Sequence, residues 1–199
     1  MATRTTYRRP DSLELTQDPE ANQLIAQDPN ALVIGWLLDQ QVTVQLAFAG
    51  PLKIRQRLGT VDPAKLATMT PAHVEQAFVE KPAVHRYAKN MAKRVQALAQ
   101  CLVDEYDGDA ERVWLDADGY DDLRARIVAL PGFGAGKAPG FAAMLARRFG
   151  LEVTGFEAEL GEYGSLADVG DYEDLLAYQV RKGAYKQALR AQRAAAEGA

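Results

Sequence analysis

The chain is poor in the residues that disulfides and metal sites use. Its 199 residues include one cysteine, Cys101, and two histidines. A single thiol excludes an internal disulfide and any four-cysteine zinc or iron–sulfur site, and two histidines argue against a conventional metal site. We expect Cys101 to be a small buried apolar residue, and we expect no iron–sulfur cluster among the cofactors.

Long apolar runs are also missing. The longest apolar stretch covers residues 31–38, far fewer than the ~20 residues that a membrane-spanning helix needs. The basic residues within 1–10 are not followed by the apolar segment of a signal peptide. We therefore predict a cytoplasmic protein without a membrane partner.

Strand patterns are nearly absent, whereas helix starts are frequent. No segment alternates apolar and polar residues for more than a few positions. Four prolines follow an Asp or a Thr, a combination that caps a helix and places proline at its first position. These pairs are Asp18-Pro19, Asp28-Pro29, Asp62-Pro63 and Thr70-Pro71. Apolar residues at helical spacing follow each pair, so we predict an all-α fold of about nine or ten short helices.

The charge is unevenly distributed along the chain. The net charge is −4, and residues 104–122 hold nine acids against one base. Basic residues gather instead within 85–94, 137–148 and 181–193. Local basic patches permit binding to a nucleic-acid backbone despite the acidic total, because screening at physiological salt acts over ~8 Å. Such runs are also typical of solvated helix faces, so charge alone leaves both interpretations open.

A glycine-rich turn between two apolar helices is the clearest functional signal. Residues 121–130 form the first helix, and Gly132 and Gly134 follow it in a turn that leads into a second helix up to Phe149. Glycines allow a close approach of the backbone, and the turn leaves N–H groups free at a helix N-terminus. We predict an anion site for a phosphodiester here, with Phe133 pointing inward and Lys137 adding a positive charge. A simple tight turn between helices is the alternative.

The segment from Leu130 to Ala138 resembles the helix-hairpin-helix motif of DNA-binding proteins, L-P-G-x-G-x-x-x-A. Residues 32–50 resemble the entry helices of helix-hairpin-helix DNA glycosylases, in which a glutamine pair ends an apolar helix. The order of these two features resembles the helix-hairpin-helix (HhH-GPD) base-excision DNA glycosylase superfamily over residues 20–160. The resemblance implies a fold of two helical lobes with a central cleft. It divides the chain into a lobe of residues 30–149, which ends in the hairpin 121–149, and a lobe of residues 1–29 plus 150–199.

The resemblance also implies which residues contact DNA. In the family, a glutamine enters the duplex beside the flipped nucleotide. The residue at the equivalent position of this sequence is Gln41. The DNA-binding residues implied are Gln40, Gln41, Gly132, Phe133, Gly134, Gly136 and Lys137. The hairpin of the family often holds a potassium or sodium ion on main-chain carbonyls, which correspond to Val128, Leu130 and Phe133 here.

The family's catalytic aspartate follows a Phe-Gly pair by seven residues, and this position holds Glu157 here. The glutamate keeps the charge but reaches one methylene further, and Asp39 beside the glutamine pair is the alternative acid. Bifunctional members carry a nucleophilic lysine two residues after the second hairpin glycine, where this chain has Gly136. Because Lys137 comes one residue later, we expect no lyase activity. The expected walls of a base pocket are aromatic, namely Trp36, Phe48, Phe156 and Tyr163.

The leading hypothesis is a monomeric, monofunctional DNA glycosylase associated with the nucleoid. It would flip a modified or mismatched base out of double-stranded DNA and excise it. The first alternative is a non-catalytic helix-hairpin-helix protein that recognises bent or damaged DNA, which the altered acid and the acidic total charge favour. A helical protein-interaction domain without nucleic acid is the third.

Overall fold

The computed structural model describes residues 7–197. Within these residues every regular element is helical, which confirms the predicted all-α class. The first seven helices are α1 (Pro19–Gln27), α2 (Pro29–Leu38), α3 (Val44–Phe48), α4 (Gly50–Leu58), α5 (Pro63–Thr68), α6 (Pro71–Val79) and α7 (Ala88–Tyr106). The following α-helices are α8 (Arg112–Leu115), α9 (Gly119–Ala129), α10 (Ala138–Phe149) and α11 (Tyr172–Glu197). Three 3-10 turns join them, η1 (Ala135–Lys137), η2 (Phe156–Glu159) and η3 (Leu166–Asp168).

The proline-marked helix starts form as predicted, and three of the four carry a side-chain cap. The carboxylate of Asp18 accepts from two backbone N–H groups at the start of α1, and Asp28 does the same for α2. Asp62 accepts from one N–H group of α5, whereas Thr70 makes no side-chain bond at the start of α6. Each bonded cap satisfies donors that have no partner in the first helical turn.

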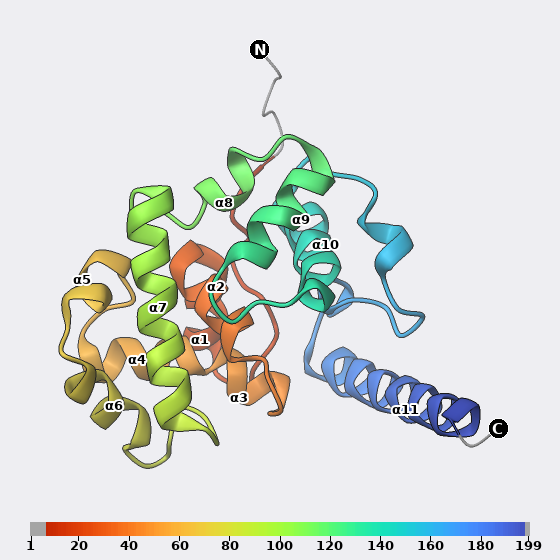
Figure 1. The fold of residues 1–199 in the computed structure, drawn as a ribbon, viewed down its shortest axis with the longest axis horizontal. Coiled ribbons are helices and arrows are strands. Elements are labelled where there is room, and N and C mark those ends of the chain that lie inside the picture. Colours follow the sequence, from red (N-terminus) through yellow and green to blue (C-terminus); the bar gives the residue numbers. More distant parts are fainter. Residues whose placement is uncertain (1–6, 198–199) are drawn as a thin grey trace.

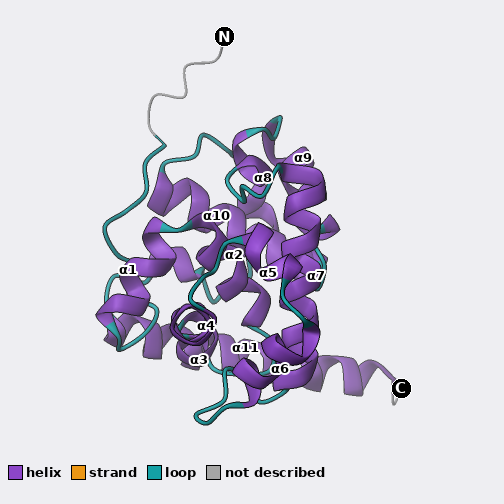
Figure 2. Cartoon of the chain, turned by 90° about the vertical axis from the view of Figure 1, so that its left-hand side faces the viewer, coloured by secondary structure: helices purple, strands orange, loops and turns teal. Residues whose placement is uncertain are grey.

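Helix α2 is the centre of the molecule (Figures 1 and 2). Every residue from Ala31 to Leu38 is buried, and the helix packs against α1, α3, α4 and α7. Helix α10 packs against α9 and against the two turns η2 and η3 that follow it. The C-terminal end of α2 also meets the start of α10. If Gly140 of α10 carried a Cβ, that atom would lie 3.4 Å from the Trp36 ring of α2.

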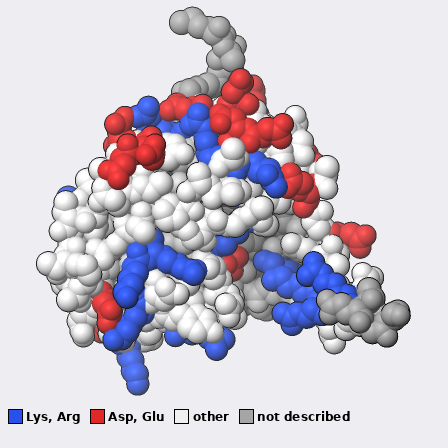
Figure 3. All heavy atoms as spheres, in the orientation of Figure 1, with Lys and Arg blue, Asp and Glu red and all other residues white. Residues whose placement is uncertain are grey.

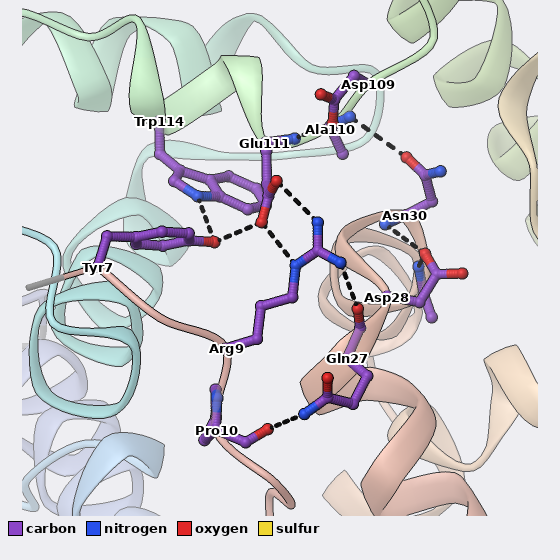
Figure 4. Close-up of polar contacts among 11 residues, drawn as sticks. Tyr7, Arg9, Pro10, Gln27, Asp28, Asn30, Asp109, Ala110, Glu111 and Trp114 are labelled. Carbon is purple, nitrogen blue, oxygen red and sulfur yellow. Dashed lines mark hydrogen bonds and ion pairs between the residues drawn. The ribbon is translucent and has the colours of Figure 1, made fainter. Parts of the chain in front are cut away.

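The N-terminal segment is fixed to the second half of the chain (Figure 4). The Tyr7 hydroxyl donates to Glu111 at 2.8 Å, and Arg9 makes two bonds of 2.8 Å to the same carboxylate. Trp114 donates its indole N–H to the Tyr7 oxygen. Burial raises the pKa of Tyr7 far above its ordinary value, and the Arg9 guanidinium lowers the pKa of Glu111. This network holds residues 7–9 against α8.

The division into the two lobes stays a prediction, and residues 1–6 and 198–199 of the second lobe lie outside the described residues. Helix α1, assigned to that lobe, packs on α2, α3 and α4. Helix α11 contacts η3 and extends away from the other helices towards the C-terminus (Figure 1). None of the helices within residues 7–197 has the length and apolar character that a membrane span requires.

Candidate nucleic-acid interface

The turn between α9 and α10 presents free backbone donors to solvent. The Phe133 N–H donates to the Leu130 carbonyl at 3.0 Å, and the Lys137 N–H donates to the Gly134 carbonyl at 3.0 Å. Gly134, Ala135 and Gly136 are exposed. Their N–H groups bond to no other group in the described part of the chain. Three neighbouring N–H groups ahead of a helix form the kind of array that binds a phosphate.

Glycine is required at position 132 for two separate reasons. Gly132 has a φ of 83°, in the left-handed region that side chains disfavour. A Cβ at this position would also lie 2.6 Å from the buried Leu37 side chain, which would have to move. The next residue, Phe133, is 8% exposed and stacks on Phe141 of α10 with ring centres 6.4 Å apart. Its predicted inward orientation is confirmed.

Lys137 contacts the end of α2. Its ammonium group donates to the carbonyls of Trp36 and Leu37 at the end of α2 and lies 5.2 Å from the centre of the Phe133 ring. Burial lowers the pKa of Lys137 to about 8, and the negative charge of Asp39 acts in the opposite direction. The ammonium group of Lys137 thus bonds to protein carbonyls at the cavity, and its role as a positive charge for a phosphate stays a prediction.

The two glutamines have different roles. The side-chain amide of Gln40 donates to the Leu37 carbonyl at 2.7 Å and to the Gly132 carbonyl at 3.3 Å, and its oxygen accepts from Arg94 at 2.5 Å. Gln40 thus connects α2, the hairpin turn and α7, and its contact with DNA stays a prediction. Gln41 is exposed, with a φ of 56°, and its side-chain oxygen accepts from the Tyr87 hydroxyl at 3.3 Å.

A cavity of about 230 Å³ opens beside the hairpin turn. It lies between the end of α2, the start of α10, residues 159–166 and the first half of α11. Its aromatic lining residues are Trp36, Tyr163 and Tyr178. Its charged lining residues are Asp39, Glu159, Lys137, Lys182 and Lys186. Gly136 lines the cavity too, so the array of free N–H groups and the cavity are contiguous.

Comparisons with known proteins relate the chain to one family. The family model described as "HhH-GPD superfamily base excision DNA repair protein" matches residues 34–192, which is more than half of the chain. The chain belongs to the HhH-GPD superfamily. No curated protein matches the sequence significantly.

A solved structure of endonuclease III, trapped as a covalent intermediate with DNA in an estranged-adenine complex, is similar to part of this chain. The two chains are 22% identical and align with a TM-score of 0.44. The alignment covers 62% of this chain and 49% of the endonuclease III chain, so the chain spans about half the length of that structure.

Of the two candidate acids, Asp39 lies at the cavity, whereas Glu157, which the HhH-GPD resemblance implied, does not. Glu157 is exposed and accepts from the backbone N–H of Gly155 at 2.8 Å, within its own turn. Asp39 ends α2, lines the cavity and accepts no hydrogen bond from the described residues. Glu157 is therefore not part of the cavity lining, and its catalytic role stays a prediction. The turn η2 places Glu159, two residues later, on the lining instead.

The four aromatic residues expected in the pocket divide in the same way. Trp36 and Tyr163 line the cavity, as predicted. Phe48 is fully buried behind Trp36, with ring centres 5.8 Å apart. Phe156 is buried against Tyr120, 6.2 Å between centres. The placement of Phe48 and Phe156 in the pocket wall is wrong, because both belong to the core.

The hairpin carbonyls are compatible with the monovalent cation that the HhH-GPD resemblance implies. The Leu130 carbonyl accepts from Phe133, which leaves one of its two lone pairs free. The carbonyls of Val128 and Phe133 accept no hydrogen bond from the described residues. These three oxygens would hold the ion, whose charge would favour a phosphate at the turn. No group of three or more His, Cys, Asp or Glu side chains within the described residues could hold a metal ion.

Tyr178, Lys182 and Lys186 are cavity residues that the sequence analysis did not identify. They occur at four-residue intervals on α11, a spacing that places them on one face of a helix. This spacing is visible in the sequence and could have revealed a shared surface. It does not say what that surface faces, which depends on how α11 packs against η3.

Proposed function

We propose that the protein is a monofunctional DNA glycosylase that excises a modified or mismatched base from double-stranded DNA. The observation that supports this proposal most directly is the contiguity of the two binding features. Gly136 belongs both to the row of free N–H groups and to the lining of the cavity that contains Asp39 and Trp36. A phosphate held at residues 134–136 would therefore place its nucleotide beside the cavity.

Base excision requires that the target nucleotide leaves the helical stack. In the proposed reaction, the turn binds the phosphate and Gln41 enters the space that the base vacates. Gln41 suits this role because it is exposed and its side chain makes one hydrogen bond with the described residues, from the Tyr87 hydroxyl. The base then lies against the Trp36 ring, which stacks on Phe141 with centres 5.2 Å apart and is thereby held rigidly.

The carboxylate of Asp39 is the proposed catalytic group. The bond between C1′ and the base nitrogen breaks, its electron pair leaves with the base, and positive charge develops on the sugar. A nearby carboxylate stabilises this oxocarbenium-like state. A water molecule then adds to C1′ and its proton passes to the departed base, which leaves a neutral free base and an abasic site. Asp39 suits this role because no described residue donates a hydrogen bond to it.

A second candidate function is combined glycosylase and lyase activity, which one observation favours. The amine of Lys137 lines the cavity and has a pKa of about 8. At pH 7 about a tenth of the amine would therefore be neutral and able to attack C1′. Against this, Lys137 donates to two carbonyls of α2, which favours the ammonium form and a positioning role.

The test uses a panel of duplexes, each with one modified or mismatched base. The expected result for the wild type is strand breakage only after alkali, with no adduct trapped by borohydride. Asp39→Asn should lower the excision rate about 100-fold or more while duplex binding is retained. Glu157→Gln is the matched control and should excise at the wild-type rate, because its carboxylate lies outside the cavity.

Each other outcome points to a different function. Strand breakage without alkali, together with an adduct that Lys137→Gln abolishes, would establish the lyase. Tight binding without excision of any base would contradict catalysis and leave a non-catalytic DNA-binding protein. Failure to bind any duplex at low salt would contradict both.

A further inference from the structure

One face of α11 places two lysines at the cavity, and neither forms an ion pair with a described residue. Lys182 and Lys186 line the cavity on the side of α11, while Gly136 and Lys137 line it on the side of the hairpin. The Lys182 ammonium lies 5.3 Å from the centre of the Tyr178 ring. Neither lysine makes a hydrogen bond or an ion pair with another described residue. Two cations thus converge on the cavity without partners.

The acids of the cavity do not balance its bases. Glu159 is paired with Arg124 at 3.2 Å, which leaves Asp39 as the acid that faces Lys137, Lys182 and Lys186. Burial lowers the pKa of Lys182; the charge of Asp39 opposes this change, and the charge of Lys186 adds to it. An uncompensated positive charge beside a partly closed cavity favours an anionic ligand.

We propose that Lys182 and Lys186 form a second phosphodiester-binding site, which holds the DNA strand across the cavity from the hairpin turn. This proposal rests on the proposed function for the identity of the anion. A neutral base would not offset two ammonium groups, whereas a DNA backbone already held at residues 134–136 brings further phosphates to the cavity mouth. The two lysines lie about 6 Å apart along the helix axis, so they can reach neighbouring phosphates of one strand.

The surface charge of the molecule fits this position. Lys and Arg side chains gather over α11 and, separately, over the lower half of α7, on the same face of the molecule (Figure 3). Acidic side chains gather at the opposite end, over α8 and α9. The hairpin turn lies between α7 and α11 (Figure 1), and Arg94 of α7 contacts it through Gln40. A duplex centred on the turn would therefore meet positive charge on both sides.

The experiment measures how duplex affinity depends on salt. The probe is a duplex that contains an abasic-site analogue, and its dissociation constant is determined between about 50 and 200 mM salt. Each phosphate that a protein neutralises contributes about 0.9 to the slope of log affinity against log salt concentration. Lys182→Gln/Lys186→Gln should therefore reduce the slope by about 1.8 and weaken binding at low salt.

Two further variants exclude a general effect of charge or folding. Lys65→Gln/Lys81→Gln removes the same charge from exposed positions far along the chain and should leave the slope unchanged. Lys182→Arg/Lys186→Arg keeps the charge and should retain the wild-type slope. All variants are compared by thermal melting, which shows that each of them is folded.

If Lys182→Gln/Lys186→Gln leaves the slope of log affinity against log salt concentration unchanged, this proposal is overturned. That holds even if the variant excises a different base from the wild type. Excision by the wild-type protein is scored separately on the same samples. If excision occurs and the slope is unchanged, the lysine site is contradicted and the glycosylase stands. If the slope falls but no base is excised, the lysine site stands and the glycosylase is contradicted.

Discussion

At the scale of single residues, two neighbouring glycines of one turn serve different purposes. Gly132 has a positive φ and meets Leu37, so the fold depends on it. Gly134 has an extended backbone, and a Cβ there would meet nothing within 4 Å. The motif in the sequence predicts both glycines but does not separate the one that the packing requires from the one that leaves room for a ligand.

Gly132→Ala should destabilise the protein by about 2–4 kcal/mol, since a left-handed backbone and a displaced buried leucine both oppose the added methyl group. Gly134→Ala is the matched control and should change the free energy of unfolding by less than about 1 kcal/mol. Urea denaturation of both variants measures the difference. Equal losses of stability would show that the packing of Leu37 against Gly132 is not what requires glycine.

Lys137 gives the stability a specific dependence on pH. Its pKa falls from the ordinary value of 10.5 to about 8 in the folded protein, so between these values the unfolded chain binds more protons than the folded one. Stability contributed through this group therefore rises with pH across that window. The wild type should gain stability relative to Lys137→Met between about pH 8 and pH 10.5, as followed by urea denaturation at a series of pH values. A constant difference would mean that the ammonium is not desolvated.

At the scale of elements, the helices were predictable because their starts are local. An Asp or Thr before a proline selects a helix start through bonds and torsions within four residues, whatever packs nearby. The cavity was not predictable to the same extent. Phe48 and Trp36 are both apolar residues of neighbouring helices, and only the approach of α10 and α11 decides that Trp36 lines the cavity and Phe48 does not.

Two of these helix starts offer a direct comparison of caps. Asp28→Ala should cost about 1 kcal/mol of stability, because its carboxylate accepts from the N–H groups of Asn30 and Ala31. Thr70→Ala should cost much less, since the Thr70 side chain makes no capping bond. Chemical denaturation of the two variants checks the order. A larger loss for Thr70→Ala would contradict the assignment of the caps.

The catalytic assignments show the same limit of local reasoning. Counting residues from the Phe149-Gly150 pair leads to Glu157, but the loop after α10 turns within residues 156–159 and exposes that side chain to solvent. Counting two residues from Gly134 leads to Gly136, one residue before Lys137, yet the amine of Lys137 lies at the cavity. A short turn can change the direction of a side chain while the spacing along the sequence stays the same. Spacing alone could therefore not place either residue.

At the scale of the whole molecule, an acidic protein presents a basic face. The acids of residues 104–122 and the bases of α7 and α11 lie on different parts of the surface (Figure 3). The net charge of −4 therefore says little about the field near the hairpin turn. At physiological salt, charges more than ~8 Å away are largely screened, so a duplex at this face would experience mainly the local lysines and arginines.

The open donors of the turn allow a test of how the whole molecule engages DNA. Gly134→Asp should weaken duplex binding about tenfold or more, because a carboxylate would occupy the position of the phosphate. Gly134→Asn has the same size without the charge and should bind more tightly than the aspartate variant. Fluorescence anisotropy with one duplex measures both. Equal affinities of the two variants would remove the argument for a phosphate at the turn.

Gln41 rests in a backbone conformation that costs an L-amino acid about 1–2 kcal/mol. The backbone of the folded protein is strained by this amount in the loop between α2 and α3, where the Gln41 side chain lies beside Tyr87. Insertion into a duplex would then need little rearrangement, since the costly torsion is already in place. Gln41→Asn, which tolerates this conformation better, should make the free protein more stable, yet its shorter reach would leave the gap in the base stack only partly filled.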